Sequence, residues 1–82
     1  MTEATTQQQT NLATHHADFA LTAILAGLSR VHEHAPDRMA RTQPIMIEAL
    51  EIALRVHRRN AATPGQLREL EVLRGRMEGI LG

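Results

Sequence analysis

The stretch 45–56 is apolar except at three positions, Glu48, Glu51 and Arg55. On a helix, these three and Arg58 follow one another at intervals of three, four and three residues, so they form one narrow charged stripe. Most of the remaining circumference of that helix is apolar. Such a helix needs cover on more than one side, and a chain of 82 residues has few other elements to provide it. The sequence therefore predicts that a second copy or another protein covers part of this helix.

The composition favours an all-α fold. Phe19 is the only aromatic residue, so the core must consist of Leu, Ile, Val, Met and Ala, which suit helix packing better than sheets. The chain has no cysteine, which excludes disulfides and thiolate metal sites. A chain of this size buries only about 60% of the surface that its unfolded form exposes, so its stability is marginal without a partner. We therefore expect a small three-helix bundle that dimerises through its first and second helices.

Capping residues and helix breakers predict where the first helix lies. It is expected to begin at Thr10 or Asn11, both good N-caps, and to end near His34, before an Ala-Pro-Asp sequence. This boundary makes residues 1–10 a disordered polar tail and residues 11–82 a single helical domain. The apolar positions of this helix alternate by four and three residues, the spacing of a coiled-coil seam. They are Ala17, Leu21, Ile24, Leu28 and Val31, with Phe19, Ala20 and Leu25 at the margins.

Gly27 lies in the middle of the first helix, where glycine costs about 1 kcal/mol relative to alanine. The sequence therefore predicts either a close approach of another helix or a local bend at this residue. After the first helix, Asp37 is expected to cap a short turn over 38–41. Whether that turn and the second helix form one kinked helix or two stays open.

The second and third helices carry clearer end signals. Thr42 is expected to cap the second helix, which should end at Arg59 with Asn60 in a left-handed conformation. The third helix should begin with a capping box, in which Thr63 and Gln66 bond each other's backbone N–H groups. Its apolar face consists of Leu67, Leu70, Leu73, Met77 and Ile80 or Leu81.

Catalytic and metal chemistry find little support in the sequence. Ser29 is the only serine, and although His32 follows at helical spacing, no orienting acid or oxyanion donor is recognisable. His16 and His32 lie about 24 Å apart along one helix, so they cannot share an ion within one chain. A zinc site between two antiparallel copies is the alternative role for the histidines. The five histidines are expected to be structural or incidental, and they are His15, His16, His32, His34 and His57. The sequence thus predicts that the protein is not an enzyme and binds no cofactor.

The charge balance argues against nucleic acid and membranes as partners. Nine arginines offset nine carboxylates, which leaves no net field to attract phosphates. The longest apolar window, 19–28, is about half as long as a bilayer span. Residues 1–10 lack the basic start and apolar stretch of a signal peptide, so a cytoplasmic location is expected. A helix-turn-helix-like DNA-binding regulator remains the alternative, with its phosphate contacts at Arg55, His57, Arg58 and Arg59.

The remaining function is non-catalytic binding to another protein or protein complex, as an adaptor, a regulator or a stoichiometric inhibitor. No motif of a known family is present. By size and class alone, small neutral helical proteins of this kind are used as inhibitors by phages and mobile elements, anti-CRISPR proteins among them. We expect a homodimer with a polar rim of Arg55, Arg58 and Arg59 at its interface. The expected buried or interface positions are Ile45, Met46, Ile47, Leu50 and Leu54.

Overall fold

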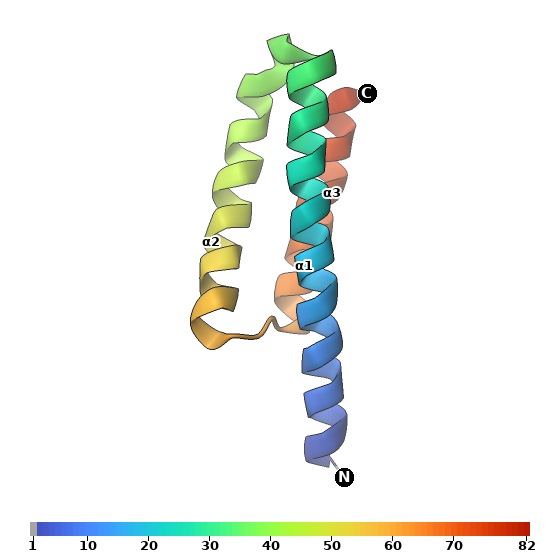
Figure 1. The fold of residues 1–82 in the computed structure, drawn as a ribbon, viewed down its shortest axis with the longest axis vertical. Helices are drawn as coiled ribbons and strands as arrows, with labels where there is room; N and C mark the ends of the chain where they lie inside the picture. The colour runs from blue at the N-terminus through green and yellow to red at the C-terminus, as the bar shows by residue number, and fades with distance from the viewer. Residues whose placement is uncertain (1) are drawn as a thin grey trace.

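Three α-helices run up, down and up alongside one another in the computed structural model, which describes residues 2–82 and the side chains of residues 7–82 (Figure 1). Helix α1 spans Thr2–His34, α2 spans Gln43–Arg59 and α3 spans Pro64–Leu81. A 3-10 helix, η1, spans Pro36–Thr42; it follows α1 after Ala35 and leads directly into α2. The described residues contain no strand, so the predicted all-α three-helix bundle is confirmed.

Helix α1 begins at Thr2, so the predicted start at Thr10 or Asn11 is wrong. Residues 2–10 contain neither glycine nor proline, and they include three glutamines, which are good helix formers. Nothing in this segment therefore stops the helix, which continues beyond the end of the bundle (Figure 1). The predicted boundary between a tail and a domain at residue 10 stays a prediction.

Helix α1 packs most extensively against α3, and Gly27 explains how the two approach so closely. Gly27 is buried, and a Cβ atom placed on it would lie 2.6 Å from Cγ of Met77, which is itself 1% exposed. The predicted close approach at this glycine is thus confirmed. The rest of the buried face of α1 consists of small or branched residues, Ala13, Ala17, Ala20, Ile24 and Val31.

The core lies between this face of α1 and one face each of α2 and α3. Helix α2 contributes Ile45, Ala49, Ile52 and Val56, and helix α3 contributes Leu70, Leu73, Met77 and Ile80. Leu21 and Leu28, which the seam spacing also predicted, are only partly buried at the edge of this core. Phe19, at the margin of the predicted face, is 66% exposed.

The local signals at the start of α3 and the end of α2 are confirmed. The hydroxyl of Thr63 accepts a hydrogen bond from the backbone N–H of Gln66 at 3.1 Å. The side-chain oxygen of Gln66 accepts one from the backbone N–H of Thr63 at 2.9 Å. Asn60 adopts the left-handed conformation with φ of 57°, which ends α2.

Replacing Thr63 with alanine is expected to lower the free energy of unfolding by about 1 kcal/mol, because the first turn of α3 loses its cap. Urea denaturation followed by circular dichroism measures this change. Thr22 provides the matched control, because its exposed hydroxyl donates only to the backbone carbonyl of Asp18 in its own helix. Thr22→Ala should leave the stability unchanged or slightly raised, and equal losses in the two variants would contradict the capping role.

The connection between α1 and α2 differs from the prediction. The turn starts at Pro36 after Ala35, so Asp37 lies within its first turn and does not cap it. Thr42 does stand at the N-cap position of α2, but its hydroxyl donates to the carbonyl of Met39 at 2.6 Å and caps no helical N–H. The helix type changes from 3-10 to α at this point, so η1 and α2 are two continuous elements of different pitch.

Two hydrogen bonds over a long sequence separation fix the ends of the bundle. At one end, the guanidinium of Arg38 in η1 donates to the carbonyl of Ile80 at 2.7 Å, where it also faces the negative end of the α3 dipole. At the other end, the hydroxyl of Thr14 in α1 accepts a hydrogen bond from the backbone N–H of Ala62 at 2.9 Å. These bonds hold η1 and the α2–α3 loop against the paired helices.

Candidate functional site

Helix α2 carries three large aliphatic side chains that the rest of the chain leaves uncovered. Ile47 is 50% exposed, and Leu50 and Leu54 are each 57% exposed. They lie away from the buried positions of α2, which follow at spacings of three and four residues and face α1 and α3. Ile47, Leu50 and Leu54 are called the outer face of α2 from here on. Helices α1 and α3 therefore cover only part of the apolar circumference of α2.

An apolar groove between α1 and α2 continues this surface. The groove has a volume of about 160 Å³ and no charged residue among those that line it. Leu50 belongs both to the groove and to the outer face of α2, so the two form one surface. On the α1 side, Leu25 adds a side chain that is 54% exposed. The complete lining is Leu21, Ile24, Leu25, Met46, Ala49, Leu50 and Ala53.

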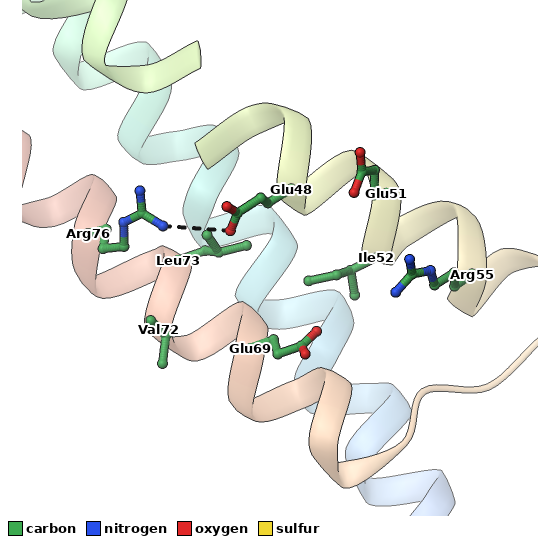
Figure 2. Close-up of a pocket in the computed structure, with 8 residues that line it drawn as sticks. All are labelled: Glu48, Glu51, Ile52, Arg55, Glu69, Val72, Leu73 and Arg76. Atoms are coloured by element: carbon green, nitrogen blue, oxygen red, sulfur yellow. Dashed lines mark ion pairs between the residues drawn. The ribbon is translucent and has the colours of Figure 1, made fainter. Parts of the chain in front are cut away.

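The opposite side of α2 is charged. A groove of about 350 Å³ separates α2 from α3, and Glu48 of α2 contacts Arg76 of α3 across it at 3.6 Å (Figure 2). Of the four residues in the predicted charged stripe, Glu48, Glu51 and Arg55 line this groove. Both partners of the ion pair are about half exposed, so the pair is solvated and contributes little stability. Outside the core, the surface of α2 is thus apolar on the flank beside α1 and charged on the flank beside α3.

The residues proposed from the sequence as an interface fall into three groups: buried or partly buried residues, exposed apolar residues and exposed arginines. Ile45 is 2% exposed and belongs to the core, and Met46 is partly buried in the apolar groove. Ile47, Leu50 and Leu54 form the exposed outer face. The arginines at the C-terminal end of α2 are exposed, and they are Arg55, Arg58 and Arg59.

Leu25 is a surface residue that the sequence placed only at the margin of the α1 face. The apolar spacing of the first helix indicated this position, since Leu25 lies one residue beyond the seam position Ile24. Its contribution to a groove with α2 depends on which side of α1 the second helix occupies. That choice is made by tertiary packing, so the helical period alone did not reveal it.

Ser29 and His32, the residues considered for catalysis, are both exposed, as are the five histidines. The rings of His15 and His16 lie 5.9 Å apart, and His34 lies 3.8 Å from the exposed carboxylate of Glu33. Among the described residues, no group of three histidine, aspartate or glutamate side chains is arranged to hold a metal ion. These residues do not converge on a common centre.

In the part of the chain that the structure describes, no helix combines the length and the apolar character needed to cross a membrane. Comparison of the chain with protein-family models, curated proteins and solved structures found no match.

Proposed function

We propose that the protein is a non-catalytic protein–protein interaction module that docks through the outer face of α2 and the adjoining apolar groove. The observation that supports this proposal is the exposure of Ile47, Leu50 and Leu54 on one helix, next to an apolar groove that Leu50 also lines. Contiguous exposed apolar surface of this kind is typical of docking sites. In the cell, the protein would act as an adaptor, a regulator or a stoichiometric inhibitor that docks onto a larger protein complex in the cytoplasm.

The size of the surface is consistent with a specific but modest contact. Fully burying one leucine or isoleucine side chain stabilises by about 1.5–3 kcal/mol, so covering three that are about half exposed contributes a few kcal/mol. Exposed arginines lie at the C-terminal end of α2, the helix that carries the outer face. Arg55, Arg58 and Arg59 can bind carboxylates of a partner in a bidentate manner, as a polar rim does in many interfaces.

The alternative, a helix-turn-helix-like DNA-binding regulator, has weaker support. The three helices lie alongside one another, and no helix projects across the others as a recognition helix does (Figure 1). Helix α3 carries three arginines and three glutamates, which gives no excess positive charge. The arginines that end α2 lie at the negative end of its dipole, so they also have a structural role.

A capture experiment with surface variants tests the proposal. Tagged protein is incubated with nuclease-treated lysate of the source cells, and the mass of the eluted complex is measured by light scattering. Leu50→Asp combined with Leu54→Asp should abolish capture, because two charges would have to be buried in the contact. Val72→Asp is the matched control, since Val72 is 61% exposed but lies on α3.

Circular dichroism first establishes that both variants keep the helix content of the unmodified chain. Capture by the unmodified chain and by Val72→Asp, together with loss of capture in the double variant, supports docking through α2. Equal capture by all three proteins contradicts it. Retention on duplex DNA that weakens steeply with salt, and that is lost on replacing Arg58 and Arg59 with alanine, would instead favour the DNA-binding alternative.

A further inference from the structure

The charges of α2 are sorted along its length. Its acidic residues, Glu48 and Glu51, lie in the first half, and its basic residues lie in the second half, from Arg55 to Arg59. Two copies of such a helix packed in parallel would place like charges side by side. Packed antiparallel, they place the acidic half of one copy against the basic half of the other. The charge pattern of α2 is therefore complementary to itself in one orientation only.

From this pattern we infer that the first occupant of the outer face of α2 is a second copy of the chain, packed antiparallel about a two-fold axis near Ala53. The inference rests on the proposed function, because it names the partner of the same surface. A two-fold axis makes the contact isologous, so each copy uses the same residues and the dimer closes without growing into a filament.

The pairing of Glu51 with Arg55 sets the register of the two helices, which rise about 1.5 Å per residue. Glu51 and Arg55 lie two residues on either side of Ala53, so an axis there sets Glu51 of one copy level with Arg55 of the other. The two-fold symmetry makes this ion pair form twice. The same axis places Leu50 and Leu54 of the two copies around the centre, within about 5 Å of the axis along the helix.

The charges that this arrangement needs are available. Among residues 7–82, the ion pairs involve neither Glu51 nor Arg55, and both side chains are exposed. Arg58 would be level with Glu48, which already contacts Arg76 in its own chain. Glu51 and Arg55 are therefore the pair that decides the orientation.

The apolar groove between α1 and α2 supports the same occupant. Its lining includes Leu25, Met46 and Leu50, and it lies beside the outer face on the side away from the charges. An antiparallel copy of α2 packed on the outer face would place its own Leu50 and Leu54 level with this groove. These can enter the groove, so that apolar surface meets apolar surface on one flank while opposite charges meet on the other.

Two charge-reversal variants test the inference. The first is Glu51→Arg and the second is Arg55→Glu, and their self-association is measured by sedimentation velocity over a range of concentrations. In either homodimer, both symmetric contacts change from attraction to repulsion, so the dissociation constant should rise about tenfold or more. In an equimolar mixture, each introduced charge faces its opposite in the other variant. The mixture should therefore form a heterodimer about as tightly as the unmodified chain forms its homodimer.

The outcomes separate this inference from the proposed function. Dimers of the unmodified chain, weakened in each variant and restored in the mixture, support the antiparallel second copy. A chain that stays monomeric at all concentrations, or variants that dimerise as well as the unmodified chain, would overturn it. In that case, loss of lysate capture with Leu50→Asp and Leu54→Asp would still support docking of a different protein on the same surface. The double variant should also be monomeric if the second copy occupies this face.

Discussion

Replacing Gly27 with leucine is expected to lower the free energy of unfolding by about 3 kcal/mol, the largest effect of any single change considered for this bundle. A Cβ atom at this position would lie 2.6 Å from Cγ of Met77 and 3.7 Å from its Cβ. Met77 is buried and cannot swing into solvent, so relief of the clash requires α1 and α3 to separate. Because these two helices form the most extensive contact in the bundle, their separation disrupts the core.

Gly75 offers the matched control. It lies in the middle of α3, and a Cβ atom placed on it would meet no atom within 4 Å outside its chain neighbours and its own helix backbone. Gly75→Leu should therefore raise the stability by about 0.5–1 kcal/mol, since leucine favours a helix more than glycine does. Urea denaturation of both variants measures the difference. Similar stabilities for the two would show that α1 and α3 do not approach closely at Gly27.

Replacing Thr14 with valine is expected to cost about 1–3 kcal/mol, although the two side chains have nearly the same shape. The hydroxyl of Thr14 is the acceptor for the backbone N–H of Ala62, which is 0% exposed. Valine provides no acceptor, so this N–H group would be buried without a partner. The bond links α1 to the loop between α2 and α3, and its loss should also release that loop.

Three further measurements make the Thr14 prediction specific. Thr14→Ser keeps the hydroxyl and should retain most of the stability. Thr22→Val removes an exposed hydroxyl that donates only within its own helix, and it should change the stability by less than about 0.5 kcal/mol. Hydrogen exchange should show faster exchange of the Ala62 amide in Thr14→Val. An unchanged exchange rate, with unchanged stability, would contradict the structural role of this bond.

The sequence predicted best the features that residues close together in the chain determine, such as helix caps and the apolar face of a helix. The capping box of Thr63 and Gln66 involves residues three positions apart, and Asn60 ends α2 through its own backbone conformation. Both could be recognised because the partners are close in the chain. The apolar period of α3 likewise placed Leu70, Leu73 and Met77 in the core.

Contacts between distant residues could not be predicted in the same way. The hydrogen bond from Arg38 to the carbonyl of Ile80 spans 42 residues, and that from Ala62 to Thr14 spans 48. Neither has a local pattern, because each depends on how the helices are stacked. The predicted start of α1 was also wrong. Thr10 and Asn11 are good N-caps, but they do not end a helix when the residues before them include no glycine or proline.

The exposed apolar face of α2 was predicted in part. The wide apolar circumference of α2 indicated that this helix needs cover beyond one side, and the outer face formed by Ile47, Leu50 and Leu54 is indeed left uncovered within the chain. The period alone did not show that Ile45 would be buried while Ile47 is exposed, because either side of an apolar helix can face the core. The position of α1 and α3 around α2 makes that choice.

The central claim, that another protein surface covers the outer face of α2, is tested most directly by hydroxyl-radical footprinting with mass spectrometry. The dilute isolated chain is compared with the heaviest species that light scattering finds, either in concentrated protein or in the complex captured from lysate. Leu50 and Leu54 should be oxidised less in the heavier species. Leu12 and Phe19, which are exposed apolar residues on α1, should be oxidised equally in both. Unchanged oxidation of the two α2 leucines, protection of Phe19 instead, or absence of any species heavier than one chain would contradict the account.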